Sequence, residues 1–356
     1  MRAILMLEDG RSFLGQTDMR VLPKVGKVIF DTRVVGYQEA LTDTANAGKI
    51  LTFTYPLIGN YGVARKFNQS ARVWPVAAII KEKSAITSNW QAEECFSRWA
   101  RKSNLPVIYG IDTRTLAVYL RQKGEMLGVV SSSVFKAGQL LKAIKEARDN
   151  CMHQNWLKKT SVKTIQHLGK RGARNKVVVL DLGVSQAILK ELENLKLSIA
   201  LVPFNTPTEK ILKLKPKALV ISNGPEVNGE HKDLALTLKG LLGKIPVLGI
   251  STGAHVLALS LGAKIKKMPI GHHGLNYPVK PVNSLKGNIT TQGHSYAIDA
   301  KSLAKSKGTK VTAYNLNDNS VEEFENKKLK ILGVQYYPLS PGFNQVHPVL
   351  KRFLKF

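Results

Sequence analysis

The Gly-Ile-Ser-Thr-Gly run at residues 249–253 is the part of the chain best suited to chemistry. It follows the apolar run 245–248, and a helix-like pattern continues over residues 255–261. A strand that turns sharply into a helix in this way forms a nucleophile elbow, which lifts one side chain into a cleft. The run therefore predicts that the Ser251 hydroxyl lies at the carboxyl end of a strand.

A serine hydroxyl is a weak nucleophile unless a neighbouring base removes its proton. His255 lies four residues along the same predicted helix, so its side chain falls on about the same face as Ser251. No acidic partner for this histidine is evident in the sequence. A serine hydrolase that uses Ser251 and His255 therefore stands only as a less favoured hypothesis.

The elements that must position Ser251 alternate between strand and helix over residues 176–356. The strand-like runs in this part are 177–180, 197–202, 218–221 and 245–250. This alternation predicts an α/β fold with an open, mostly parallel sheet flanked by helices, which binds ligands beyond the carboxyl ends of its strands. The turn at 222–225 follows one of these strands, so it could face the same pocket as Ser251.

Residues 1–150 have a mixed β and α pattern and predict a separate domain. Strand-like runs occur at 3–7, 28–30 and 50–55, and apolar residues have helical spacing at 113–123 and 136–147. Asp112 or Thr113 is expected to cap the first of these helices. Residues 151–175 are basic and have no periodic pattern, so they predict a linker before the domain at 176–356.

The net charge of +28 on 356 residues raises the hypothesis of a nucleic-acid or acidic partner. The charge is spread thinly, except for residues 158–174, which hold six basic residues and no acidic ones. This stretch is interpreted either as a solvated linker or as a docking surface.

The two cysteines, Cys95 and Cys151, have no metal or redox spacing, and the histidines offer too few convergent ligands for a metal site. No apolar run reaches membrane-spanning length, and residues 1–7 lack a signal-peptide pattern. A cytoplasmic protein without metal is therefore expected.

Six blocks of sequence, in order along nearly the whole chain, resemble the small subunit of carbamoyl phosphate synthetase. These blocks are 36–43, 54–62, 110–114, 222–225, 257–264 and 271–279. The resemblance implies that the first domain is the one peculiar to this subunit and that the second is a class I glutamine amidotransferase domain.

In that family the small subunit hydrolyses glutamine. A cysteine thiolate attacks the amide, a histidine transfers the proton, a glutamate orients the histidine, and two backbone N–H groups stabilise the oxyanion. The ammonia passes to a large subunit, which makes carbamoyl phosphate for pyrimidine and arginine biosynthesis. The resemblance thus implies a large-subunit partner that carries ATP and magnesium, and no cofactor in this chain.

This sequence departs from the family at all three catalytic positions. Ser251 stands where the family has cysteine, Tyr337 where it has histidine, and Leu339 where it has glutamate. Tyrosine is a poor general base because the pKa of a phenol is about 10. Leucine can neither orient a base nor stabilise its charge.

The positions that contact glutamine in the family are mostly altered as well. By resemblance these positions are Ala45, Gly224, Glu226, Thr252, His255, Gly293, Ser295 and Tyr296. Ala45 stands where the family has serine, His255 where it has glutamine, and Glu226 places a carboxylate beside the expected oxyanion site. The sequence therefore predicts a pseudoenzyme subunit that supports ammonia-dependent synthesis, as in the animal urea-cycle enzyme, whose elbow also reads Ile-Ser-Thr-Gly. The alternative is a basic binding protein that acts without a synthetase.

Overall fold

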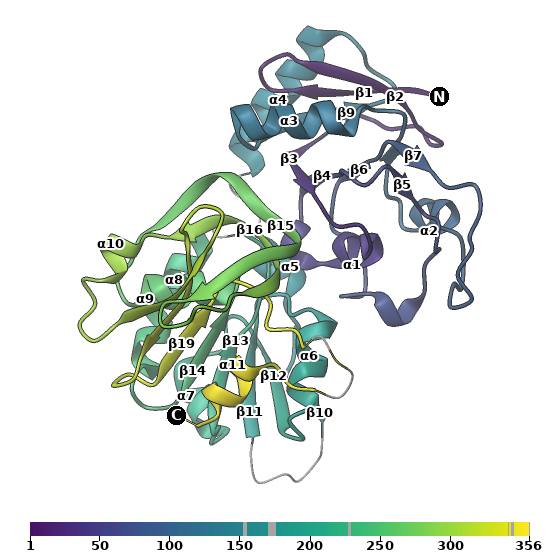
Figure 1. Cartoon of the computed structure of the whole chain (residues 1–356). Helices are drawn as coiled ribbons and strands as arrows, with labels where there is room; N and C mark the ends of the chain where they lie inside the picture. Colours follow the sequence, from purple (N-terminus) through teal and green to yellow (C-terminus); the bar gives the residue numbers. More distant parts are fainter. Residues whose placement is uncertain (152–154, 170–175, 227–228, 341, 343–344, 356) are drawn as a thin grey trace. The chain divides into compact units, whose positions relative to one another are not determined.

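The computed structural model describes the chain except for residues 152–154, 170–175, 227–228, 341, 343–344 and 356 (Figure 1). The chain divides into two compact units. The first comprises Met1–Gln154 with Pro269–His273, and the second comprises Asn155–Met268 with Gly274–Phe356. A short segment from late in the sequence thus belongs to the first unit.

The first unit is built on a seven-stranded mixed sheet with the order β2-β1-β9-β3-β4-β6-β8. Its strands are β1 (Arg2–Leu7), β2 (Ser12–Gln16), β3 (Lys24–Asp31), β4 (Lys49–Phe53), β6 (Ala77–Ile79), β8 (Val107–Ile108) and β9 (Met126–Ser131). A short pair, β5 (Leu57–Ile58) and β7 (Glu82–Lys83), lies outside this sheet. The pairs β3–β4, β4–β6 and β6–β8 are parallel.

Helices pack on both faces of this sheet because successive strand residues point to opposite sides. One face carries α3 (Thr113–Lys123), whose Leu116 and Leu120 pack with Val28 and Ile50. The other helices of the unit are α1 (Tyr37–Thr42), α2 (Phe96–Lys102), α4 (Ala137–Cys151) and the short 3₁₀ turns η1 (Thr44–Asn46) and η2 (Arg65–Phe67). The expected cap of α3 is present, since the Asp112 carboxylate accepts from the Thr115 N–H at 3.0 Å.

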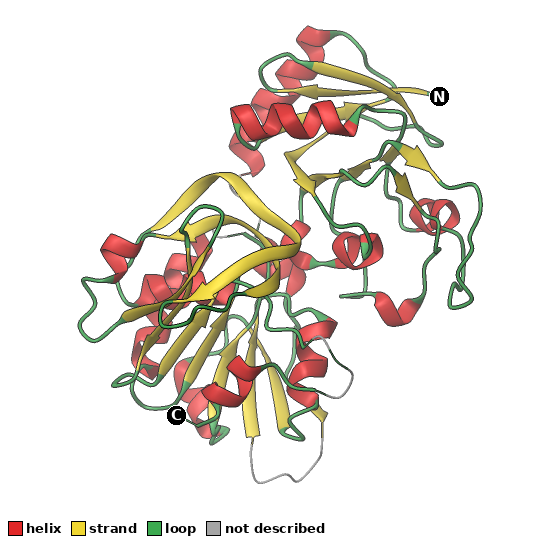
Figure 2. Cartoon of the chain, in the orientation of Figure 1, coloured by secondary structure: helices red, strands yellow, loops and turns green. Residues whose placement is uncertain are grey.

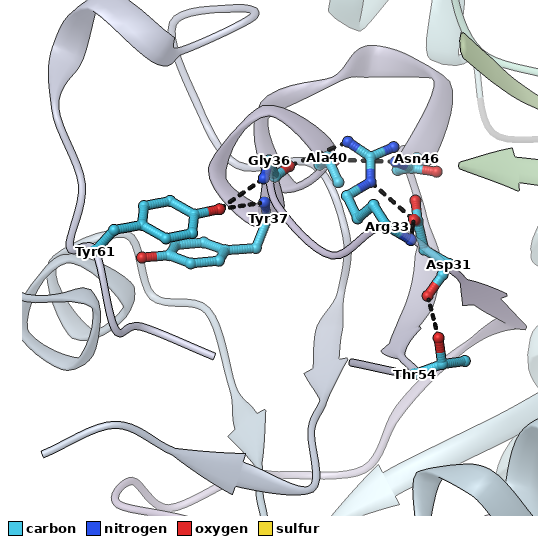
Figure 3. A network of polar contacts seen from close by, with 8 residues as sticks. All are labelled: Asp31, Arg33, Gly36, Tyr37, Ala40, Asn46, Thr54 and Tyr61. Carbon is cyan, nitrogen blue, oxygen red and sulfur yellow. Dashed lines mark hydrogen bonds and ion pairs between the residues drawn. The ribbon is translucent and has the colours of Figure 1, made fainter. Parts of the chain in front are cut away.

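A polar network fixes the start of α1 (Figure 3). Arg33 donates from Nε to Asp31 at 2.8 Å and from Nη1 to the carbonyl of Gly36 at 3.0 Å. The Tyr61 hydroxyl accepts from the N–H groups of Gly36 and Tyr37 at 2.6 and 3.1 Å, and burial raises its pKa to about 12. Because Gly36 has a φ of +90°, a conformation that favours glycine, the chain can turn into the helix here.

The second unit is built on a ten-stranded sheet with the order β10-β12-β11-β13-β14-β19-β18-β17-β15-β16. Its strands are β10 (Gln166–Gly169), β11 (Lys176–Asp181), β12 (Ser198–Pro203), β13 (Ala218–Ile221), β14 (Val247–Ile250), β15 (Ile265–Pro281), β16 (Asn288–Ile298), β17 (Lys310–Asn315), β18 (Val321–Asn326) and β19 (Ile331–Val334). The five strands from β12 to β19 are parallel, as expected, and antiparallel strands extend this centre at both ends.

Helices cover both faces of this second sheet (Figure 2). They are α5 (Trp156–Thr160), α6 (Gln186–Glu193), α7 (Thr208–Lys213), α8 (Gly229–Leu238), η3 (Lys239–Leu241), α9 (Thr252–Ser260), α10 (Ala300–Leu303) and α11 (Pro348–Phe353). On one face Val256 and Leu257 of α9 are buried with Leu219, and on the other Ile188 of α6 and Phe353 of α11 are buried. The fold is therefore an α/β sandwich of helices around a mixed sheet.

The basic stretch interpreted as a patternless linker holds regular structure in its described part. Residues 156–160 form α5, where Leu157 is fully buried, and residues 166–169 form β10, which pairs antiparallel with β12. Both elements are held by contacts with distant parts of the chain, so the local sequence pattern does not predict them. Residues 152–154 and 170–175 of this stretch lie outside the described residues.

Candidate functional site

The sharp turn expected at Ser251 is present. Strand β14 ends at Ile250, helix α9 begins at Thr252, and the serine between them has a φ of 52° and a ψ of −113°. This is a strained conformation for a residue with a Cβ atom, and such strain is typical of functional turns. The Ser251 N–H donates to the carbonyl of Val334 at 2.7 Å, which ties the elbow to the neighbouring strand β19.

The glycines of the run are required by close backbone approaches. A Cβ atom on Gly249 would lie 2.5 Å from the carbonyl oxygen of Gly253, closer than real Cβ contacts. A Cβ atom on Gly253 would lie 2.8 Å from the carbonyl oxygen of Ser222 and closer still to that of Ile221. The Gly-x-Ser-x-Gly spacing therefore lets α9 cross directly over the ends of β13 and β14.

The turn at 222–225 is fastened to the elbow. The Thr252 hydroxyl lies 2.9 Å from the carbonyl oxygen of Gly224 and 3.0 Å from that of Pro225, as a donor to both. The Ser251 side chain is 1 % exposed, and its Oγ has no hydrogen-bond partner within the described chain. The Thr252 hydroxyl thus joins the turn at 222–225 to the elbow at Ser251.

The positions assigned to the family's base and orienter lie at the same end of the sheet. Tyr337 follows β19, its N–H donates to the carbonyl of Thr291 at 2.9 Å, and its hydroxyl lies 3.5 Å from the amide nitrogen of Asn223. Leu339 packs against the apolar core of its face. Neither side chain offers a group that can take a proton from Ser251 near neutral pH.

His255 is buried and hydrogen-bonded away from Ser251. Its Nε2 lies 2.9 Å from the Gln335 side-chain oxygen, and the described residues include no hydrogen bond between the imidazole and the Ser251 hydroxyl. Burial lowers the pKa of His255 to about 4, although the Gln335 hydrogen bond and the charge of Glu226 oppose this shift. The imidazole is therefore neutral at pH 7, and Glu226 is its acidic neighbour.

Three further predicted positions, Gly293, Ser295 and Tyr296, lie on β16. Between them, His294 makes contacts of 2.8 Å from Nε2 to the Gln292 side-chain oxygen and from Nδ1 to the Tyr296 carbonyl. Gln292 in turn donates to buried Glu322 at 2.9 Å. The side chains of Gln292 and His294 on this strand are thus hydrogen-bonded to other residues of the second unit.

Ala45 belongs to the first unit. It lies in η1, and its N–H donates to the Asp43 carboxylate at 3.0 Å. A methyl side chain there can donate no hydrogen bond to a substrate.

Two buried residues near His255 are not among the site residues expected from the sequence. His231 of α8 is fully buried, and its burial, together with the charge of His255, lowers its pKa to about 3. Gln335, two residues before Tyr337, accepts from the backbone N–H of Ile298 at 3.3 Å as well as contacting His255. No spacing relates residues 231, 255 and 335, so only the fold reveals the cluster.

The two buried histidines predict acid sensitivity. In the unfolded chain each takes up a proton below its ordinary pKa of about 6.5, whereas folded His255 does so only near pH 4. The unfolded state then binds more protons, so the free energy of unfolding falls as pH drops from about 6.5 toward 4, by roughly 3 kcal/mol for this residue. Urea unfolding at pH 7 and at pH 5 measures the loss.

The variant His255→Gln tests this assignment, because it removes one titrating group from the buried pair of histidines. It is expected to flatten the pH dependence while the contribution of His231 remains. An unchanged slope in this variant would contradict the assignment.

Comparisons with known proteins agree with this architecture in both halves of the chain. Residues 5–130 match the family described as carbamoyl-phosphate synthase small chain, CPSase domain, and residues 178–355 match glutamine amidotransferase class-I. The pyrimidine-specific small chain of carbamoyl phosphate synthase from Bacillus subtilis is 36% identical over 359 residues, which cover 100% of this chain and 96% of the relative. The chain belongs to the carbamoyl phosphate synthase small chain family.

Other small chains of this family are equally similar. That of Aquifex aeolicus is 36% identical over 367 residues, covering 99% of this chain and 98% of the relative. That of Listeria innocua is 35% identical over 362 residues, covering 99% and 96%. Among the helices that the structure describes, none is both long enough and apolar enough to cross a membrane.

Proposed function

We propose that this chain is a small subunit that associates with a large carbamoyl phosphate synthase subunit but does not hydrolyse glutamine. Synthesis would then use free ammonia, with ATP and magnesium on the large subunit and a structural or regulatory role for this chain. The Bacillus relative, named as pyrimidine-specific, favours pyrimidine biosynthesis, with arginine biosynthesis as the other route. A cytoplasmic location is part of the proposal.

One observation carries the proposal: Ser251 lies in a sharp elbow, and none of the described residues forms a hydrogen bond with its hydroxyl. The nearest histidine along the helix is neutral and bonded to Gln335. An unactivated serine hydroxyl does not attack an amide at a useful rate, because the alkoxide is not formed. The sharp turn is therefore formed, but we propose that no side chain accepts the proton of the Ser251 hydroxyl.

The test is a two-substrate assay on the assembled complex. The chain is co-purified with its large subunit, and carbamoyl phosphate formation is measured with glutamine and, separately, with ammonium chloride. We expect synthesis with ammonium and no glutamate release from glutamine. The same assay with the Bacillus subtilis small and large chains serves as the positive control, and glutamate release at a comparable rate would refute the proposal.

A basic binding protein is the second candidate, and the net charge of +28 favours it. Lys158 and Lys159 of α5 and the nearby Lys163 are exposed. If the chain fails to associate with a large subunit but binds nucleic acid with an affinity that falls steeply with salt, this candidate replaces the first. Labelling of Ser251 by a fluorophosphonate would instead support a serine hydrolase.

A further inference from the structure

The first unit contains a polar pocket of about 500 Å³ that is separate from the elbow. Its lining residues are Gln38, Val63, Ala64, Arg65, Asn68, Ala71, Glu93, Glu94, Arg98, Trp99 and Lys102. They come from α1, the segment around η2, the residues before α2, and α2 itself; Figure 1 labels both helices. This volume lies within the range of small-molecule sites.

Hydrogen bonds build the floor of the pocket before any ligand arrives. The buried Gln38 amide donates to the Ala64 carbonyl at 2.7 Å and to the Asn68 side chain at 2.6 Å, and its oxygen accepts from the Ala64 N–H at 3.0 Å. Gln38 follows the residues that the Tyr61 hydroxyl fixes in Figure 3. The floor is therefore rigid, which lowers the conformational cost of binding.

The wall on the α2 side is fixed as well. The Val63 N–H donates to the Glu94 carbonyl at 3.0 Å, and the Glu93 N–H donates back to the Val63 carbonyl at 2.8 Å. The ring of Phe96, at the start of α2, meets Tyr37 edge-on with 5.3 Å between ring centroids. Helix α2 therefore presents its side chains to the pocket from a fixed position.

Charges of both signs line the pocket, with three cationic and two anionic side chains. Arg65 and Glu93 are 3.8 Å apart and largely exposed, and Lys102 and Glu94 are 2.9 Å apart. The exposed Arg65–Glu93 pair contributes little to stability, so its charges remain available to a ligand, whereas Glu94 is more buried and is held by Lys102. None of the described residues forms an ion pair or hydrogen bond with Arg98, so the pocket has one cationic group in excess.

We propose that this pocket binds a small polar molecule that carries one oxyanion group and one ammonium group. The phosphate or carboxylate would contact Arg98, since a guanidinium matches either group with two parallel hydrogen bonds. The ammonium would contact Glu93, and the partly buried ring of Trp99 would form an apolar wall. The site is independent of whether glutamine is hydrolysed.

Arg101 supplies a matched control on the same helix. It lines a different and smaller hollow with Asp18 and Lys83, so it carries the same charge as Arg98 but is not among the residues that line the proposed site. Arg98→Gln and Arg101→Gln therefore change the net charge equally but only the first removes a group from the proposed site. Circular dichroism verifies that both variants fold.

The experiment titrates the full chain with two probes by calorimetry. Glucosamine 6-phosphate offers a phosphate with an ammonium group, and β-alanine offers one carboxylate with an ammonium group. We expect saturable binding of at least one probe, weakened about tenfold or more by Arg98→Gln and unchanged by Arg101→Gln. Glucose 6-phosphate and inorganic phosphate, which lack the ammonium group, should bind more weakly.

The probe that binds tells the phosphate class from the carboxylate class. Equal losses in the two arginine variants would mean that only net charge matters and would overturn the proposed site. No saturable binding of either probe up to about 10 mM would overturn it too. Glutamine-dependent activity plays no part in these measurements, so a failure here is distinct from a failure of the proposed subunit role.

Discussion

Replacing Ser251 by cysteine is expected to leave glutamate release from glutamine at the background level of the unaltered complex. A thiol is a better nucleophile than a hydroxyl, but it needs a base to form the thiolate and an acid to protonate the leaving ammonia. Tyr337 and Leu339 supply neither, and His255 is turned to Gln335. Steady-state glutamate release by the complex, measured with excess glutamine, checks the expectation.

The informative comparison is with a variant that also restores the base, by Tyr337→His, and the residue that orients it, by Leu339→Glu. Positioned proton transfer contributes about 10² to 10⁴ in rate, so Ser251→Cys with Tyr337→His and Leu339→Glu should release glutamate measurably faster than Ser251→Cys alone. Ser251→Ala serves as the blank. Substantial turnover by Ser251→Cys alone would contradict the expectation and show that another group already acts as the base.

A triple variant that stayed as inactive as the single variant would place the remaining block in the substrate positions. Glu226 would be the first position to test, because its charge acts on the pKa of His255, four residues after Ser251. Glu226→Gly in the triple background would then test that position. The loss of glutamine hydrolysis would in that case include a loss of glutamine binding as well as the loss of the catalytic groups.

The elements that carry the elbow could be predicted from sequence because their signals are local. Buried strands such as β11 and β13 appear as continuous apolar runs, since both faces of a central parallel strand are covered. Asp112 predicted the start of α3, and the Gly-x-Ser-x-Gly spacing of Gly249 and Gly253 predicted the sharp turn at Ser251. Each feature depends on a few neighbouring residues.

The features that escaped prediction depend on distant parts of the chain. Helix α5 is held by the burial of Leu157 and by the Thr160 hydroxyl, which donates to the Leu182 carbonyl at 2.6 Å. Strand β15 runs for 17 residues, and its central segment 269–273 belongs to the other unit, which no periodicity foretells. The contact of His255 with Gln335 joins residues 80 apart in sequence.

Substituting Gly253 by alanine is expected to destabilise the second unit by roughly 3–5 kcal/mol, a large effect for one methyl group. The new Cβ would lie 2.8 Å from the Ser222 carbonyl oxygen and closer still to that of Ile221, at the end of β13. These are backbone atoms, which cannot rotate away as a flexible side chain does, so α9 must shift off the sheet. The midpoint of urea unfolding, compared with the unaltered chain, reports the loss.

Gly240→Ala is the matched control in the same unit, because its Cβ would make an ordinary contact of 3.6 Å with the Thr208 side chain. It should change the midpoint little, so a similar fall in both variants would refute the close crossing of α9. A large loss for Gly253→Ala alone would mean that the crossing, and with it the strained turn at Ser251, is still required for folding. That requirement would give a physical reason for this chain to keep the elbow whether or not Ser251 is activated, since Gly249 and Gly253 also let α9 pack closely on the ends of β13 and β14.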